Sequence, residues 1–395
     1  MEKEASMLIY NVSLYFNKDL VTGAAKRFEF ISKELSRLCQ LEIVVLAGQE
    51  PSWASEYNIR VWSVEKPVRF GRLGLWLKLN QQLMSMPSGT VINDFMPVPF
   101  YGLRKHEHYQ MVHDVRNVTE FHRAKSKVLG GRFQLWQWGQ CPAFVVVSAF
   151  TAESMRALTP ALAKKRFLVS PNGLEAERFI QRLNNELRDI DVLYVATLER
   201  RKNHKVLLEA IAENTWIKRV VFLGRDLGEG EKLKQLAASI QASSQSLRID
   251  FIDHVNDEEA LIKLYACSRL YISSSLYEGF GMPLLEALAS GCAVLCSDIQ
   301  PHIEICGAKA QYFKADTEKE LVKLLAMQDA VAMPEKQKQG VIDCELVNQY
   351  SWRSIARKLL DELSSSSTKD KLMSKLTDTT TEESFNSTTE KVHAG

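Results

Sequence analysis

The sequence predicts an α/β protein built from two parallel-sheet domains. Short runs of β-branched residues alternate with helix-length segments along most of the chain, as in parallel strands joined by crossover helices. At roughly 100–200 residues per domain, the 395 residues fit two such domains better than one. The composition, 46% hydrophobic and 25% charged, is that of an ordinary globular protein and excludes wholesale disorder.

In the first half, candidate strands and helices alternate as far as residue 170. The apolar, β-branched runs lie at residues 7–13, 42–46, 59–64, 90–93, 110–113, 144–148 and 167–170. Segments with helical patterns lie between them, at residues 24–38, 73–86, 124–136 and 151–158. Crossover helices of this kind predict a parallel sheet with helices on both faces.

The second half repeats the same alternation. Its candidate strands lie at residues 192–196, 219–223, 248–252, 270–274, 293–297 and 310–313. Its candidate helices lie at residues 205–213, 229–242, 257–266, 283–290 and 317–327. The two halves therefore predict two similar units, each with its own sheet and core.

The domain boundary is expected near residue 173, where the turn Pro171-Asn172-Gly173 opens a polar linker that runs to Ile190. We expect an N-terminal domain over residues 1–173 and a C-terminal domain over residues 174–350. Ser351-Trp352 can start a last helix that runs to residue 363. Residues 364–395 contain 14 Ser or Thr among 32 residues, which predicts a disordered tail.

The net charge of +2 conceals a difference between the two halves. Residues 1–174 carry 22 Lys+Arg and 14 Asp+Glu, a net charge of +8, whereas residues 175–395 carry 28 and 34, a net charge of −6. This asymmetry predicts that the two domains face different partners. Nucleic acid is disfavoured as one of them, because the overall charge is near zero and no recognition motif occurs.

The termini and cysteines indicate a cytoplasmic protein with reduced thiols. The start Met1-Glu2-Lys3-Glu4 is charged and no signal-peptide core follows it. No run approaches about 18–20 consecutive apolar residues, so no membrane span is expected. The seven cysteines are scattered, without CxxC pairs or zinc-type spacing.

The densest chemical signal is the segment from Ser274 to Gly291, which follows an apolar strand. Gly279 and Gly281 let the backbone approach a ligand closely, and Pro283 suits the first turn of a helix. The free N–H groups at such a helix start form an anion site. Glu286, one turn inside the helix, can accept two hydrogen bonds from a vicinal diol such as ribose. The alternative is that the glutamates are favoured near the helix start by its dipole alone.

A second segment, Val195 to Lys205, places four cations within six residues at a predicted helix start: Arg200, Arg201, Lys202 and Lys205. The helix dipole disfavours cations at that end, so a bound anion would explain them. The alternative is a solvated basic helix start. A nicotinamide cofactor is disfavoured, because no Gly-x-Gly-x-x-Gly follows the first strand of either half.

These two segments resemble the donor-binding motifs of the family 4 retaining glycosyltransferases. That family has the GT-B fold, in which two Rossmann-like domains face each other across a cleft. The resemblance covers about residues 7–363 and is strongest over residues 192–313. It implies transfer of a hexose from a nucleotide-sugar with retained anomeric configuration. The residues from Tyr277 to Gly281 resemble those of members that use mannose or related hexoses, which is a weak indication of mannose.

The resemblance also implies roles for individual residues. Glu278 and His113 are the expected catalytic residues: Glu278 would hold hydroxyls of the donor sugar, and His113 would border that sugar from the other domain. Glu286 would hold the ribose, and Arg201 and Lys202 the diphosphate. Further donor contacts are expected from Gly23, Gly279, Phe280, Gly281 and Met282. A purely structural histidine is the alternative at position 113.

Some positions depart from the family pattern. Only one glycine, Gly23, stands in the first strand-to-helix loop, and Phe251-Ile252 replaces a common base-binding motif, which leaves the nucleotide base open. The pair Asp189 and Asp191 precedes a strand, so we interpret it as solvated charge rather than as a metal site. Because Arg201, Lys202 and the helix start can stabilise the leaving diphosphate, we expect catalysis without a metal or other cofactor.

Two sets of basic residues flank aromatic residues in the first half. One set is Lys66, Arg69, Arg72 and Lys78, and the other is Arg116, His122, Arg123, Lys125, Lys127 and Arg132. Such helices can lie on an anionic membrane, or they can be ordinary amphipathic helices with a solvated face. A glycan or lipid-linked acceptor in polysaccharide or lipopolysaccharide biosynthesis, met at the inner face of the membrane, fits the first interpretation.

Two other functions remain open from the sequence. The main alternative is a non-catalytic GT-B-fold binding or scaffold protein, although retention of both glutamates and of Arg201-Lys202 argues against it. A sugar-nucleotide epimerase of related build fits the block from Arg200 to Asn203 poorly.

Overall fold

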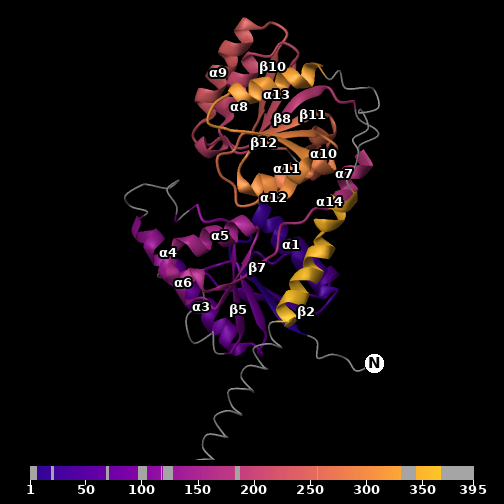
Figure 1. Cartoon of the computed structure of the whole chain (residues 1–395). Helices are drawn as coiled ribbons and strands as arrows, with labels where there is room; N and C mark the ends of the chain where they lie inside the picture. The colour runs from indigo at the N-terminus through magenta and orange to yellow at the C-terminus, as the bar shows by residue number, and fades with distance from the viewer. Residues whose placement is uncertain are drawn as a thin grey trace, which may run out of the picture.

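The computed structural model describes residues 7–18, 22–67, 71–96, 105–116, 118, 128–182, 187–255, 257–330 and 344–365. It contains two all-parallel sheets, one in each half of the chain, with helices packed around each (Figure 1). The predicted α/β fold with two parallel-sheet units is confirmed. The tail predicted to be disordered lies outside the described residues from residue 366 onward.

The first sheet has seven strands in the order β3-β2-β1-β4-β5-β6-β7. Its strands are β1 (Leu8–Ser13), β2 (Gln40–Leu46), β3 (Arg60–Val64), β4 (Thr90–Asn93), β5 (Glu107–Val112), β6 (Ala143–Val146) and β7 (Arg166–Val169). Its helices are α1 (Gly23–Ser36), α2 (Trp53–Glu56), α3 (Gly71–Ser85), α4 (Val128–Gln140), α5 (Ala149–Leu158) and α6 (Pro160–Ala163). The strands are buried on both sides, which explains their nearly continuous apolar sequences.

The second sheet has six strands in the order β10-β9-β8-β11-β12-β13. They are β8 (Ile190–Val195), β9 (Arg219–Leu223), β10 (Arg248–Ile252), β11 (Ser268–Ser273), β12 (Ala293–Ser297) and β13 (Ala310–Phe313). The main helices are α8 (His204–Ala212), α9 (Gly230–Ser243), α10 (Glu258–Ala266), α11 (Met282–Ala289), α12 (Gln300–Cys306) and α13 (Lys319–Ala330). In both sheets the strand order reverses beside the first strand of the unit, the position at which open α/β sheets bind ligands.

The segment between the two sheets differs from the predicted polar linker, because it contains a helix, α7 (Ala176–Arg182). Ala176 and Phe179 on this helix are buried in the core, and Phe179 packs near Tyr265 with ring centroids 6.3 Å apart. The described part of this segment therefore includes a helix that packs into the core through two apolar residues. The sequence did not predict this helix, because most residues of the segment are polar.

The interpretation of the Asp189–Asp191 pair as solvated charge is wrong for Asp191. Asp191 lies in β8 and is buried, and one carboxylate oxygen accepts hydrogen bonds from the backbone N–H groups of Lys218 and Arg219 at 2.7 and 2.9 Å. It fixes the start of the neighbouring strand. Asp189 is half exposed and pairs with Arg219.

A last helix, over residues 352–365, returns from the second domain to the first (Figure 1). It is preceded by α14 (Cys344–Gln349). Trp352 anchors it by stacking on Phe30 of α1, with ring centroids 5.7 Å apart. At Gly173 a Cβ atom would lie 2.5 Å from the Trp352 ring, so only glycine permits this approach. The turn before α7 and the returning helix are thus clamped together, and a backbone hydrogen bond from Leu174 to Tyr350 (2.8 Å) supports them.

Candidate active site between the two domains

The predicted site residues gather where the carboxyl ends of the two sheets approach each other. Ser274 to Gly281 follow β11, the block from Thr197 to Asn203 follows β8, and His113 follows β5. Because the carboxyl ends of parallel strands meet at one edge, loops far apart in sequence come together there. The sequence-predicted residues of the second domain form two neighbouring groups, one around Glu278 and one around Glu286.

Glu278 forms ion pairs with both predicted phosphate-binding cations. Its Oε2 accepts a hydrogen bond from Arg201 at 3.1 Å, and its Oε1 accepts one from Lys202 and another from Ser275 at 2.8 Å. Arg201 also contacts Glu199 at 2.9 Å. A short 3₁₀ turn over Arg200–Lys202 presents these cations, and Asn203 follows it in the left-handed conformation.

The ion pairs determine the charge of Glu278. Burial alone would raise the pKa of this carboxyl group, but Lys202 and Arg201 outweigh that effect and lower the pKa to about 2. The effect is mutual. Burial alone would lower the pKa of Arg201, but the carboxylates Glu278 and Glu199 raise it. The cations at this turn are thus explained at least in part by carboxylates of the protein, and Lys205 likewise pairs with Glu209 at 3.3 Å.

At Gly279 the backbone of the second domain comes very close to that of the first. A Cβ atom at this position would overlap the carbonyl oxygen of His113 and lie 2.9 Å from Cβ of Asp114. The Gly279 carbonyl accepts hydrogen bonds from Ser148 Oγ at 2.6 Å and from Thr151 Oγ1 at 3.2 Å. The sequence predicted a close approach of Gly279 to a ligand, whereas the structure shows a close approach to the backbone of the other domain.

The same contact continues on both sides of Gly279. The Tyr277 hydroxyl accepts a hydrogen bond from the Val115 N–H at 3.2 Å. The Glu304 carboxylate on α12 accepts hydrogen bonds from the Ala149 and Phe150 N–H groups, at 2.8 and 3.2 Å, at the start of α5. The strand-end loops of the two sheets are therefore joined by several hydrogen bonds around one glycine.

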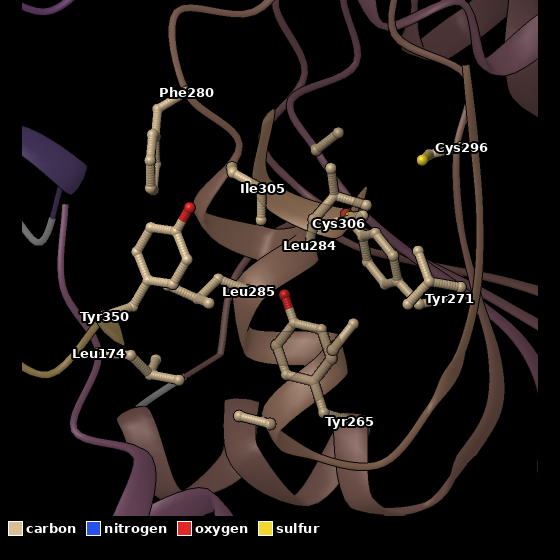
Figure 2. Packing of buried hydrophobic residues seen from close by; sticks show 14 of the residues in the cluster. Leu174, Tyr265, Tyr271, Phe280, Leu284, Leu285, Cys296, Ile305, Cys306 and Tyr350 are labelled. Carbon is tan, nitrogen blue, oxygen red and sulfur yellow. The ribbon is translucent and has the colours of Figure 1, made fainter. Parts of the chain in front are cut away.

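The side chains of Phe280 and Met282 pack against the core at the start of α11. Phe280 is buried, and its ring centroid lies 6.0 Å from that of Tyr350. Figure 2 shows these two side chains next to each other, with Leu285 nearby. Met282 is half-buried against the same core. Gly281 caps the helix with φ of 131°, a conformation that side chains rarely adopt. The side chain of Phe280 therefore packs into the core at the start of α11.

Glu286 is buried one turn inside α11. Its Oε2 accepts a hydrogen bond from the Tyr265 hydroxyl at 2.8 Å, and its Oε1 lies 3.9 Å from Nζ of Lys26. Burial raises the pKa of Glu286, although Lys26 and the Tyr265 hydrogen bond oppose that shift. Oε1 of Glu286 is thus near enough to Lys26 for electrostatic attraction but too far from it for a hydrogen bond.

In the first domain, His113 pairs with Asp94 across two strand ends, Nε2 to Oδ1, at 3.1 Å. Both residues line a cavity of about 1050 Å³ that extends between α3 and α4. Its wall includes Tyr15, Arg72, Leu73, Trp76, Gln110, Arg116, Phe133 and Trp138. Gly23 begins α1, whose first turn is capped by Thr22, which accepts a hydrogen bond from the Ala25 N–H at 3.1 Å.

Sequence patterns missed several residues of this site: Lys26, Asp94, Ser148, Glu258, Tyr265 and Glu304. Asp94 follows β4 directly, so the rule that sites lie at strand ends could have found it. The others act through contacts between residues far apart in the chain, such as the 232 positions between Lys26 and Glu258.

Comparison with known proteins now gives the fold and a family match for the second domain. Residues 175–340 match the family model described as "Glycosyl transferases group 1". The structure of HepE from Anabaena in complex with UDP and glucose superposes with a TM-score of 0.66 at 16% sequence identity, over 91% of this chain and all of that one (100%). The chain has the GT-B fold, and its second domain carries the match to the group 1 glycosyltransferases. The fold predicted from the resemblance is therefore confirmed.

Two curated relatives match part of this GT-B chain. O-antigen chain mannosyltransferase B of Escherichia coli is 35% identical over 119 residues, which is 29% of this chain and 30% of that protein. N-acetylgalactosamine-N,N'-diacetylbacillosaminyl-diphospho-undecaprenol 4-alpha-N-acetylgalactosaminyltransferase of Campylobacter jejuni is 29% identical over 141 residues, 35% of this chain and 36% of that protein. The matches thus span about a third of these relatives' length.

We predict that Gly279→Ala keeps the two domains apart, because the added methyl group overlaps the His113 carbonyl oxygen. Small-angle X-ray scattering should show a larger radius of gyration for the variant than for the wild type. Gly139→Ala on α4 is the control, because a Cβ atom there has no neighbour within 4 Å. Identical scattering of Gly279→Ala and the wild type would show that the domains tolerate the methyl group.

We predict that Glu278→Gln destabilises the protein at pH 7 and has much less effect near pH 2. The folded-state pKa of about 2 lies below the ordinary value of 4.5, so the ion pairs stabilise the fold above pH 4.5 and are lost as the pH falls toward 2. Removing one partner of a buried ion pair costs about 3–5 kcal/mol. Denaturation of both proteins at several pH values measures the difference.

Glu153→Gln provides the matched control for that experiment. Glu153 pairs with Arg156 on α5, but its side chain is 71% exposed, so its loss should cost less than about 1 kcal/mol. The assigned ion pairs would be contradicted if the free energy of unfolding of Glu278→Gln differed from that of the wild type by the same amount at pH 7 and at pH 2.

Proposed function

We propose that this protein is a retaining, family 4 glycosyltransferase that moves a hexose from a nucleotide-sugar to a glycan or lipid-linked acceptor. The observation that carries the proposal is the convergence at Gly279: Glu278, which pairs with Arg201 and Lys202, precedes it, and the backbone carbonyl of His113 in the other domain lies against it. A cluster of cations and a carboxylate from one domain thus lies next to the loop of the other domain that carries His113 and Asp94. Transfer between a donor and an acceptor requires such a meeting.

The second domain would bind the donor. Arg201 and Lys202 would neutralise the diphosphate, and the N–H groups at the start of α11 would add to that effect. Glu286, buried beside Tyr265, would accept the ribose hydroxyls through Oε1. Glu278 would hold sugar hydroxyls while it keeps the two cations in place, and Gly23 at the start of α1 would approach the phosphates from the first domain.

The transfer step needs stabilisation of an oxocarbenium-like sugar and of a leaving diphosphate at the same time. The cations would stabilise the diphosphate, and His113, held by Asp94, would border the sugar. In the mechanism that we propose, the bond from the anomeric carbon to the phosphate oxygen breaks, and that oxygen takes the proton of the attacking acceptor hydroxyl. We propose that no metal takes part.

The cavity of about 1050 Å³ between α3 and α4 would hold the acceptor, because it opens beside His113 and Asp94. Its aromatic and amide side chains suit sugar rings and hydroxyls, and Arg72 and Arg116 suit an anionic group. The names of the curated relatives include a mannosyltransferase of O-antigen chains and an enzyme acting on a diphospho-undecaprenol acceptor. They support a mannose or related hexose and an acceptor in polysaccharide or lipopolysaccharide biosynthesis.

The outer rim of the cavity would touch an anionic membrane at the inner, cytoplasmic face. Four apolar side chains on α3 and α4 are about half exposed: Leu73 (49%), Leu77 (49%), Phe133 (51%) and Trp136 (54%). Arg72 and Arg132 are exposed next to them in sequence. The predicted basic residues Arg69, His122, Arg123, Lys125 and Lys127 lie outside the described residues. Among the described helices, none is both long and apolar enough to cross a membrane.

We predict that Lys202→Met weakens nucleoside diphosphate binding by about 1.5–3 kcal/mol, the value of a hydrogen bond to a charged group. Calorimetry with UDP, GDP and ADP measures the affinity and identifies the base. Lys205→Met is the control, because Lys205 belongs to the same block but is 69% exposed and pairs with Glu209. If no nucleoside diphosphate binds the wild type, the scaffold alternative replaces the proposed enzyme.

The metal-free mechanism is tested in the same preparations once the donor is known. Transfer of the sugar should continue at an unchanged rate after treatment with a chelator. Loss of transfer that magnesium restores would contradict this part of the proposal.

We predict that the protein co-sediments with vesicles containing anionic lipid more strongly than with neutral vesicles. The double variant Phe133→Ser/Trp136→Ser should reduce this binding by roughly tenfold or more, because burial of even one large apolar side chain contributes about 1.5–3 kcal/mol. Leu227→Ser, which removes a 57% exposed leucine of the second domain, should bind vesicles like the wild type. Equal sedimentation of wild type and double variant would favour a soluble acceptor.

A further inference from the structure

Lys26 is the side chain of the first domain that reaches the predicted ribose site. It lies in the first turn of α1, three residues after Gly23, and is mostly buried, with 19% of its side chain exposed. Its Nζ is 2.8 Å from Oε1 of Glu258 and 3.9 Å from Oε1 of Glu286. Both carboxylates belong to the second domain, so the ammonium group bridges the two domains at this point.

The two glutamates repel each other without that cation. The side chain of Glu286 is 6% exposed, so its charge is weakly screened, and Glu258 adds a further effect that disfavours ionisation of Glu286. Lys26 compensates both carboxylates, while Arg178 of α7 contacts Glu258 from the linker side. Two uncharged tyrosines also act on Glu286: Tyr265, which donates a hydrogen bond to it, and Tyr271, which lies further away.

The geometry around Glu286 leaves one carboxylate oxygen suited to a ligand. Oε2 is taken by the Tyr265 hydroxyl at 2.8 Å. Oε1 faces Lys26 at 3.9 Å, which is close enough for electrostatic attraction and too long for a hydrogen bond. A hydroxyl group that enters here can therefore donate to Oε1 without displacing Lys26. Figure 2 shows Tyr265 within the core beneath Leu285, the residue that precedes Glu286.

We propose that Lys26 is a positioning residue that fixes the Glu286 carboxylate as the acceptor of the ribose hydroxyls, and thereby couples donor affinity to closure of the two domains. The inference rests on the proposed function, since it takes the ribose of a nucleotide-sugar as the ligand of Glu286. Lys26 acts through Glu286 and Glu258 and needs no contact with the donor.

The coupling follows from the position of Lys26 on the opposite domain. When α1 approaches α10 and α11, the ammonium group lowers the cost of a charged Glu286, and an ionised carboxylate is the better acceptor for a diol. When α1 withdraws, Glu286 loses the compensation by Lys26 and keeps the Tyr265 hydrogen bond. Donor binding and domain closure are then linked equilibria. The free energy by which closure strengthens donor binding is the same as that by which a bound donor favours the closed arrangement.

The experiment compares ribonucleoside and 2′-deoxyribonucleoside diphosphates by calorimetry, with the base that the wild type binds best. Lys26→Met should lower the affinity for the ribonucleotide about tenfold, the loss of one charge-assisted interaction, and reduce the preference over the deoxynucleotide. Lys26→Arg should restore most of both, because it keeps the positive charge. In a Glu286→Gln background, Lys26→Met should have little further effect.

Lys33→Met is the matched control. Lys33 lies on the same helix with 17% of its side chain exposed, but its partner Glu29 belongs to that helix. This variant should keep the ribose preference of the wild type, and thermal denaturation checks that both variants are folded.

The outcomes separate the two proposals. If Lys26→Met binds both nucleotides like the wild type, or loses affinity for both equally, the positioning role is overturned and the donor site stands. Equal losses would mean that Lys26 contacts phosphate or merely holds the domains together. If the wild type binds no nucleoside diphosphate, the donor site and the role of Lys26 both fall.

Discussion

The contact between Gly279 and the His113 carbonyl sets the geometry on which the rest of the site depends. No side chain fits at position 279 while the two domains are in this arrangement. The hydrogen bonds from Ser148 and Thr151 to the Gly279 carbonyl form only at that distance. Because Glu278 precedes Gly279 in the chain, the position of its carboxylate follows from the same contact. The proposed donor and acceptor groups are thus brought together by backbone proximity rather than by long side chains.

Charge in the second domain is balanced locally, in spite of its net acidity. Arg201 and Lys202 face Glu278 and Glu199, so two cations meet two carboxylates within one strand-end cluster. Such pairing is required, because a buried charge without a partner is strongly unfavourable. The net charge of −6 over residues 175–395 therefore says nothing about the sign of the cleft surface. The overall charge difference between the halves is better explained by their outer faces, such as the exposed arginines of α3 and α4.

The strands and most helices were predictable from the sequence because each sheet is parallel and covered on both faces. Continuous apolar strands and periodic helices are strong local patterns. Helix α7 was not predictable in this way, because its buried residues Ala176 and Phe179 stand in a polar stretch. The prediction for Asp191 was wrong for the opposite reason. Asp191 is a charged residue that is nevertheless buried, because its carboxylate accepts hydrogen bonds from two backbone N–H groups of the adjacent segment. Both depend on tertiary neighbours that no local window contains.

Within the site, the sequence indicated which residues converge in the second domain and missed how the first domain reaches them. Glu278, Arg201 and Lys202 belong to strand-end loops whose adjacency follows from the fold. Lys26 looks like an ordinary helix lysine, and its partners Glu258 and Glu286 lie more than 200 positions later. Its burial between two carboxylates becomes apparent only when the domains are placed together. The contact between the domains is consequently electrostatic as well as steric, since Lys26 of α1 lies beside Glu258 and Glu286 of the second domain.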